Sequence, residues 1–527
     1  MICQRLLLFS FCALCLLSAN ESPAQKAQNP VIFADVPDMS MMRVGDTYYM
    51  SSTTMHMAPG VPVMTSKDLI NWKITSYCYD ILDEVDALNL VNGKSTYGRG
   101  TWASSIRYHK GLFYVSTFAQ TTNKTYIYTT DDPEKGEWKK TSFAPAYHDH
   151  SLFFDDDGRI YFIWGVGRLR IIELEADLSG VKEETERVLI ENASAPAGSP
   201  MGLQSEGSQL FKVNGRYYLF NICWPRGGMR TVVIHRAPSL EGPWEGRLAL
   251  QDKGVAQGGM VNTPDERWFA YLFRDYGSVG RIPYLVPIQW QDGWPVLGIE
   301  GKVPDELDLP VGKGLKPGIV NDDEFNRKAG EPELPLVWQW NHNPDNNLWS
   351  LSERPGYLRL KTGRIDKSFL LARNTLTQRS FGPQSSGSTL LDVSGMKDGD
   401  VAGLVALQRK FGQVGVKMEG SNKYIFMTSN KTDTPTEIER LPLKKKKVYL
   451  RIDCDYREMT DLARFYYSLN GKTWKEIGRP LKMEYTLVEH FMGYRFGLFN
   501  YATKQSGGWA DFDYFRIDGQ IIENNEQ

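Results

Sequence analysis

Short apolar runs of aromatic and β-branched residues recur along the first half of the chain, each following a polar turn that usually contains glycine. A tight polar turn followed by such a run is typical of a β-hairpin and the buried strand after it. Long helical periodicity is absent between the runs, which favours strands throughout. The copies are RVGDTYYMSST (43–53), RYHKGLFYVST (107–117), DDDGRIYFIWG (155–165), KVNGRYYLFNI (212–222) and TPDERWFAYLF (264–274).

The copies recur every 50 to 65 residues or so, which is the length of a small antiparallel sheet with its loop. Self-similarity at such a period indicates a solenoid or a propeller, and five copies predict five blades around a central axis. The main alternative is an array of β-sandwiches. We therefore predict an all-β chain in which residues 29–305 form a five-bladed β-propeller.

The pattern changes after the fifth copy. The segment GKVPDELDLPVGKGLKPGIVNDDEF (301–325) is rich in Pro, Gly and Asp and predicts a linker, which we place at 306–320. Alternating strands follow, among them KKVYLRIDCDY (446–456) and ARFYYSLNGKTW (463–474), and the second contains an Asn-Gly hairpin turn. This pattern predicts a β-sandwich of the jelly-roll kind over residues 321–520.

The N-terminus reads as a signal peptide. One arginine precedes an apolar run from Leu6 to Leu17, which is too short to span a membrane comfortably, and small residues follow it. We expect residues 1–24 to be removed after Ala24, with Ala19 as the second choice of cleavage site. The mature protein would then be periplasmic or extracellular, without a membrane span.

The charge and aromatic content of the chain restrict the kinds of ligand that it can bind. A formal net charge of -2 argues against nucleic acid or an anionic membrane surface as the main partner, whereas 12% aromatic residues suit a neutral ligand that stacks, such as a sugar. The cysteines outside the predicted signal peptide are odd in number and widely spaced, so we expect free thiols in strands rather than disulfides or a metal site. They are Cys78, Cys223 and Cys454.

Three carboxylates fall at comparable points in different blades. Asp38 precedes the first hairpin, Asp149 precedes the third, and Glu206 precedes the fourth, so all three are expected at one mouth of the channel. Asp38 follows a proline, and an Asp in such a pair is often only a turn residue. Two carboxylates across a sugar are nevertheless the minimum for glycoside hydrolysis, and a third would favour the protonated form of the acid.

Several motifs resemble glycoside hydrolase family 43. The chain is similar to this family along the whole predicted propeller, and residues 337–360 and 372–404 resemble the C-terminal sandwich of its β-xylosidases. The propeller motifs are NPVIFADVPDMSMMRVGDTYYM, WASSIRYHKGLFYV, HDHSLFFDDDGRIYFIWG, EGSQLFKVNGRYYLF and SVGRIPYLVPIQWQDGWP. The resemblance implies a five-bladed propeller that hydrolyses pentose-containing polysaccharide with inversion, as β-xylosidases and α-L-arabinofuranosidases do.

The resemblance also implies roles for the three carboxylates. Asp38 matches the general base of the family, Asp149 the residue that modulates the pKa of the acid, and Glu206 the general acid. Asp35 is then a turn or structural acid beside the base. The family commonly writes Asp-Pro-Ser at both aspartates, whereas Met39 and His150 stand in the proline positions here.

Other positions match the surroundings of the family's substrate. Arg281 resembles the arginine that holds sugar hydroxyls, and Trp102 matches a position where a ring can stack on sugar or fill the core. Trp164 and Trp224 are candidates for the channel mouth, His148 and His150 for the site wall, and Trp338 and Trp340 for the sandwich core.

We expect no cofactor and no metal. Many members of the family hold calcium on the propeller axis near a histidine, but the matching stretch VAQGGMVNTP has Gln257 there.

Two alternatives remain. One is a non-catalytic propeller that binds polysaccharide, although such a protein would not need all three carboxylates. The other is an endo-acting arabinanase on the same scaffold, against which the appended sandwich favours exo action. The sequence does not distinguish xylose from arabinofuranose as the released sugar.

Overall fold

The computed structural model describes residues 26–328, 334–432 and 434–523. The predicted signal peptide lies outside these residues. Within them, the structure contains no helix long and apolar enough to cross a lipid bilayer.

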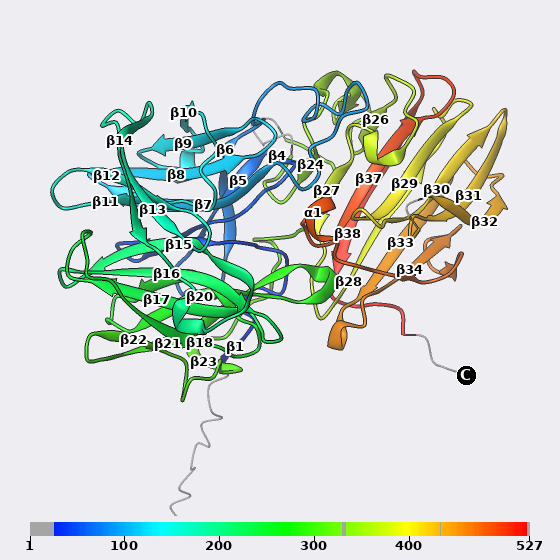
Figure 1. Cartoon of the computed structure of the whole chain (residues 1–527). Coiled ribbons are helices and arrows are strands. Elements are labelled where there is room, and N and C mark those ends of the chain that lie inside the picture. The colour runs from blue at the N-terminus through cyan, green and yellow to red at the C-terminus, as the bar shows by residue number, and fades with distance from the viewer. Residues whose placement is uncertain (1–25, 329–333, 433, 524–527) are drawn as a thin grey trace, which may run out of the picture.

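The N-terminal half is a five-bladed β-propeller, the fold expected from the repeats (Figure 1). In the described residues each blade is a four-stranded antiparallel sheet. The first strands of neighbouring blades contact one another, which places them innermost. The blades are β2 (Ser40–Val44), β3 (Thr47–Ser51), β5 (Gly60–Ser66) and β6 (Lys73–Tyr79); β7 (Thr101–His109), β8 (Leu112–Ala119), β9 (Lys124–Thr130) and β10 (Lys139–Phe143); β11 (Ser151–Phe154), β12 (Ile160–Trp164), β13 (Leu169–Leu174) and β14 (Val181–Ile190); β15 (Met201–Val213), β16 (Arg216–Pro225), β17 (Thr231–Ala237) and β18 (Glu245–Leu250); and β19 (Ala256–Asn262), β20 (Trp268–Asp275), β21 (Arg281–Gln291) and β22 (Trp294–Leu297).

The turn between the first two strands of a blade explains the glycines of the repeat. Gly45, Gly111, Gly158 and Gly215 all adopt positive φ angles between 61° and 88°, a region that a side chain disfavours. The fifth blade has no glycine there, and Glu266 takes the left-handed conformation instead, with φ 62°. The strands that follow these turns bury their aromatic and β-branched residues between blades, as the repeat pattern predicts.

The two ends of the propeller segment pair with each other. Strand β1 (Lys26–Gln28) forms a two-stranded antiparallel sheet with β23 (Glu306–Pro310). The sequence ELDLP of β23 lies inside the segment expected to be a linker. Part of that segment is therefore a strand, because Leu307 is buried in this pairing while its neighbours face outward.

The C-terminal half is a β-sandwich of two large antiparallel sheets, as predicted (Figure 1). One sheet contains β24 (Gln339–Asn341), β27 (Leu376–Arg379), β29 (Asp400–Leu407), β30 (Gly412–Glu419), β31 (Asn422–Ser429), β32 (Thr436–Pro442) and β37 (Arg495–Ala502). The other contains β25 (Trp349–Ser350), β26 (Leu358–Lys361), β28 (Gln384–Asp392), β33 (Lys447–Asp455), β34 (Leu462–Ser468), β35 (Lys475–Glu476), β36 (Leu481–Lys482) and β38 (Trp509–Asp518). A single α-helical turn within the described residues, α1 (Leu487–His490), leads into β37.

The propeller contributes an edge strand to the sandwich. Strand β4 (Met57–Ala58), which follows the second strand of blade 1, pairs with β24, so that Ala58 lies opposite Trp340. Trp338 and Trp340 are buried in the core, as expected. One hydrophobic cluster continues from blades 1, 4 and 5 into the sandwich, so the two halves share part of their core.

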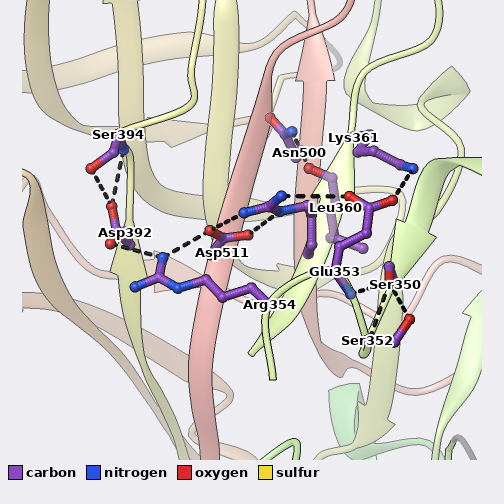
Figure 2. A network of polar contacts seen from close by, with 11 residues as sticks. Ser350, Ser352, Glu353, Arg354, Leu360, Lys361, Asp392, Ser394, Asn500 and Asp511 are labelled. Atoms are coloured by element: carbon purple, nitrogen blue, oxygen red, sulfur yellow. Dashed lines mark hydrogen bonds and ion pairs between the residues drawn. The ribbon is translucent and has the colours of Figure 1, made fainter. Parts of the chain in front are cut away.

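A polar network joins three strands of the second sandwich sheet (Figure 2). Asp511 on β38 accepts hydrogen bonds from Arg359 Nε and Nη2 at 2.7 and 2.9 Å and from Arg354 Nη1 at 2.8 Å. Arg354 also reaches Asp392 on β28 at 3.0 Å. The Asp511 side chain is 4% exposed, so its charge is compensated by the two guanidinium groups rather than by water.

The three cysteines outside the expected signal peptide are buried free thiols on β6, β16 and β33. This confirms the expectation drawn from their spacing.

Candidate active site

The innermost strands of the blades begin at the same mouth of the propeller and position the three carboxylates. Asp38 lies two residues before β2 and Asp149 two residues before β11, with φ angles of 49° and 47°. Aspartate tolerates this left-handed conformation because its short side chain forms local hydrogen bonds. Glu206 lies on β15 at an irregularity in its pairing with β16, opposite Ile222.

Asp38 is buried and held by two partners. Arg281 Nη1 donates to both carboxylate oxygens at 2.6 and 2.7 Å, and Thr53 Oγ1 donates to Oδ2 at 2.6 Å. Arg281 is itself buried at the start of β21, so this is an ion pair away from water. These bonds fix the orientation of the carboxylate.

His148 joins the other two carboxylates. Its Nε2 lies 3.2 Å from Glu206 Oε2 and 3.8 Å from Asp149 Oδ2. The Asp149 carboxylate and the hydrogen bond to Glu206 raise the pKa of His148 to about 9, so the imidazole is charged at neutral pH. Burial raises the pKa of Asp149, with further contributions from the Glu206 and Asp38 carboxylates, while His148 opposes the rise. The sequence predicted His148 in the wall of the site, but it did not predict that the imidazole is charged.

Asp35 has a structural role, as expected. Its Oδ1 accepts the backbone N–H of Arg281 at 2.8 Å, and its Oδ2 accepts the backbone N–H of Gly493 at 2.9 Å. A Cβ atom at Gly280 would lie 2.2 Å from Asp35 Oδ1, so only glycine fits beside this carboxylate. Asp35 therefore ties blade 5 and the sandwich to the mouth of the propeller.

The sandwich contributes to the site through the segment after α1. The Phe491 ring lies 4.6 Å from the Trp102 ring and 4.6 Å from the Arg281 guanidinium, measured to the ring centroids. Its backbone carbonyl accepts a hydrogen bond from Arg281 Nη2 at 3.3 Å. The sequence did not predict a role for Phe491, because more than 200 residues separate it from the two side chains that it contacts.

The structure places the tryptophan candidates at this same mouth. Trp102 is partly buried at the start of β7, and its Nε1 has no hydrogen-bond partner among the described residues. Trp164, at the end of β12, packs edge-on against Tyr147, with ring centroids 5.1 Å apart. Trp224 lies near the end of β16 and is exposed. His150 faces inward instead, against Phe162, and burial lowers its pKa to about 4.

The propeller axis beneath the carboxylates is occupied by an arginine. Arg107 on β7 donates through Nη2 to Ser151 Oγ at 3.0 Å and to Gln209 Oε1 at 3.1 Å, and through Nη1 to Ser40 Oγ at 3.3 Å. These partners belong to blades 1, 3 and 4, so the guanidinium lies where the innermost strands converge. A buried positive charge in this position does not fit a bound calcium ion.

His148, Asp149 and Glu206 lie close enough together for a metal ion, because one ligand atom from each falls within 4.8 Å of the other two. The charged imidazole, however, has no free lone pair to offer a metal at neutral pH. A metal ion would have to displace that proton before His148 could bind it, whereas the hydrogen bond between His148 and Glu206 uses the proton.

Paired carboxylates at the mouth of a five-bladed propeller, with a guanidinium holding one and an imidazolium beside the other, are the arrangement of a glycosidase. The chain belongs to glycoside hydrolase family 43. The profile described as "Glycosyl hydrolases family 43" matches residues 27–295, and the profile "Beta xylosidase C-terminal Concanavalin A-like domain" matches residues 322–518. The family expected from the motifs is thus confirmed.

Individual relatives agree with this assignment. A solved structure described as a bifunctional GH43-CE protein of Bacteroides eggerthii is 64% identical, with a TM-score of 0.94 over 95% of this chain. The chain spans 64% of the length of that protein. A "Beta-xylosidase" of Formosa agariphila is 28% identical over 93% of this chain and 90% of its own length. "Non-reducing end alpha-L-arabinofuranosidase BoGH43B" of Bacteroides ovatus is 26% identical over 82% of this chain and 81% of its own.

Proposed function

We propose that the protein is an exo-acting glycosidase that removes xylose or arabinofuranose from plant cell-wall polysaccharide or oligosaccharide, with inversion at the anomeric carbon. The observation that carries this proposal is the convergence of Asp38, Asp149 and Glu206 at one mouth of the propeller. The names of the relatives, β-xylosidase and α-L-arabinofuranosidase, support a pentose substrate. They lend no support to a non-catalytic lectin or to an endo-arabinanase.

In the proposed reaction, Glu206 donates its proton to the glycosidic oxygen as the bond from that oxygen to the anomeric carbon breaks. Asp38 takes a proton from a water molecule, whose oxygen attacks the anomeric carbon from the opposite face. The two hydrogen bonds from Arg281 hold the Asp38 carboxylate in place for this role. The sugar hemiacetal and the free leaving group then depart, and the proton balance is restored through solvent.

Asp149 and His148 act on the acid. The imidazolium of His148, 3.2 Å from Glu206, stabilises the carboxylate that forms when Glu206 gives up its proton. The buried Asp149 carboxyl lies beside both groups, and its Oδ2 is 3.8 Å from His148 Nε2. The positive charge of His148 therefore lies beside the negative charge that develops on Glu206 during the reaction.

Exo action is supported by the sandwich. Phe491 lies between Trp102 and Arg281, which places a side chain from the second domain over one side of the mouth. An extended polysaccharide passing through the site from both directions would meet this side chain. A chain end entering from the other side would not.

A panel of nitrophenyl pentosides tests the function. We expect hydrolysis of the β-D-xylopyranoside or the α-L-arabinofuranoside, and NMR spectra taken in the first minutes should show the inverted anomer of the free sugar. No hydrolysis of any pentoside, or release of the retained anomer, would contradict the proposal. Export is tested separately by N-terminal sequencing of the mature protein, for which we expect cleavage after residue 24.

Two substitutions test the assigned roles. Glu206→Gln removes the proton donor, so hydrolysis of a disaccharide should fall by roughly 10²–10⁴-fold while an activated aryl glycoside loses far less. Asp38→Asn should slow both substrates alike, because water must be activated in each case. Equal losses in both variants on both substrates would contradict this division of roles.

A further inference from the structure

The hairpin that carries Glu206 extends beyond it at the propeller mouth. Strand β15 begins at Met201, five residues before Glu206, and it pairs with the end of β16 as far as Pro225. Because Glu206 lies opposite Ile222 and Leu203 lies opposite Trp224, Trp224 lies past the carboxylate, toward the open end of the hairpin and away from the turn that joins its two strands. None of the residues that act in the proposed mechanism lies in this extension.

The Trp224 ring is exposed but its orientation is fixed. It is 42% exposed, and its Nε1 donates a hydrogen bond to the Gly228 carbonyl at 2.9 Å. The Arg230 guanidinium lies 5.7 Å from the ring centroid and is itself held by Asp275 at 2.6 Å. An indole held in this way loses little conformational entropy when a ligand packs on it.

Exposed apolar side chains accompany the ring. Met229, in the turn that follows β16, is 40% exposed. Val166 is 47% exposed, and its neighbour Gly167 donates a backbone hydrogen bond to the Ser205 carbonyl at 2.8 Å, directly beside Glu206. Apolar surface thus lies in the turns of blades 3 and 4 next to the proposed acid.

We propose that Trp224 is the platform of a leaving-group subsite, on which the sugar next to the scissile bond stacks. The inference rests on the proposed function. A general acid protonates the oxygen that belongs to the leaving group, so the leaving sugar lies on the Glu206 side of the site and away from Asp38. The C–H face of a neutral sugar packs on an aromatic face, and the hairpin extension presents such a face in that direction.

The test compares a substrate that has a leaving sugar with one that lacks it. Xylobiose and β-D-xylopyranosyl fluoride form the pair, or α-1,5-arabinobiose and α-L-arabinofuranosyl fluoride if the enzyme prefers arabinofuranosides. Trp224→Ala should lower kcat/KM for the disaccharide by roughly 10–100-fold and leave that for the fluoride within about 2-fold. Trp224→Phe, which keeps an aromatic face, should recover most of the loss.

Each other outcome overturns the inference. An unchanged kcat/KM for the disaccharide excludes a platform at Trp224, and equal losses on disaccharide and fluoride indicate a structural effect instead. A wild-type protein that is inactive on both substrates would overturn the proposed function and the subsite with it. An active wild-type protein whose kcat/KM is unchanged by Trp224→Ala would overturn the subsite alone. The melting temperature of each variant verifies its fold.

The sandwich offers a matched control. Trp509 on β38 is 37% exposed and also carries an arginine near its ring, with the Arg359 guanidinium 5.1 Å from the centroid. Trp509→Ala should leave kcat/KM unchanged on both substrates. A loss on the disaccharide in this variant equal to that of Trp224→Ala would overturn the assignment to Trp224.

Discussion

At the scale of single residues, the site depends on charges that neighbouring groups impose on one another. His148 is charged at neutral pH chiefly because Asp149 lies beside it. Asp38, by contrast, has its charge balanced by Arg281, which approaches from another blade. The mouth therefore holds one ion pair around the proposed base and a separate cluster of three titratable groups around the proposed acid.

Asp149→Asn should lower the pKa of His148 from about 9 toward its ordinary value near 6.5. The substitution removes the largest contribution that favours the imidazolium, while the hydrogen bond to Glu206 remains. NMR titration of the imidazole nitrogens measures the change directly. His109, on the far end of β7, serves as the control resonance and should titrate identically in both proteins.

An unchanged pKa of His148 in this variant would contradict the assignment of Asp149 as its main partner. The raised pKa of His148 also determines how its contribution to folding stability depends on pH. Because folding raises the pKa of His148, its contribution to stability is complete below pH 6.5 and is lost as the pH rises through about 9.

The sequence found the carboxylates because each one belongs to a local pattern. Asp38 and Asp149 directly precede an innermost strand, and Glu206 is part of one, so the repeat alone puts them at one mouth. The partners of these carboxylates depend on contacts between distant segments, which no short window contains. Arg281 was found through resemblance, while Phe491 and the axial position of Arg107 were not found, because each depends on how blades and sandwich pack.

At the scale of elements, long alternating strands were predictable and short ones were not. The aromatic runs after the glycine turns appear as the second strands of the blades. Strand β4 has only two residues and no periodicity to detect, and β23 lies in a segment whose prolines and glycines favour a linker. Both short strands exist because a distant partner strand supplies their hydrogen bonds.

Asp511→Asn should destabilise the sandwich by about 2 kcal/mol, since it leaves the Arg354 and Arg359 guanidinium groups without the carboxylate that joins β38 to its neighbours. Urea unfolding measures the change. Asp46→Asn is the matched control, because the Asp46–Lys67 pair is largely exposed and its loss should leave the urea midpoint nearly unchanged. Similar effects for the two substitutions would contradict the role given to burial.

At the scale of the whole molecule, a buried histidine cluster lies where propeller and sandwich meet. The His56 ring from the propeller lies 4.9 Å from that of His342 and 4.7 Å from that of His490, both from the sandwich, and Tyr97 packs against all three. Burial lowers the pKa of each histidine, to about 3 for His490. Nearby arginines further disfavour the charged forms: Arg495 acts on His56, Arg373 on His342, and Arg409 and Arg495 on His490.

The protein should therefore lose stability in mild acid. Below pH 6.5 the unfolded chain binds protons at these histidines while the folded chain does not, so each one lowers the free energy of unfolding by up to about 1.4 kcal/mol per pH unit. Urea unfolding between pH 7.5 and 5.0 measures the slope. His56→Leu should reduce the contribution of the cluster by about one third, and an unchanged slope would contradict the prediction.

Chelation should leave the enzyme intact. Because the guanidinium of Arg107 supplies the positive charge on the axis, EDTA should change neither the melting temperature nor the activity, and added calcium should raise neither. Differential scanning fluorimetry with and without EDTA gives the measurement. A melting temperature that rises with calcium would contradict this assignment of the axis.

The strand that the propeller lends to the sandwich constrains how the chain is made on the ribosome. Strand β4 emerges with the first blade, but its partner β24 follows only about 280 residues later, roughly half a minute at ordinary rates of synthesis. During that interval the edge that β4 presents has no native partner. A propeller cut off after its last blade would keep this open edge permanently, and a sandwich expressed alone would lack its outermost strand. The two halves are therefore not independent units of the chain. Exchange of either half between relatives succeeds only if β4 and β24 come from the same protein.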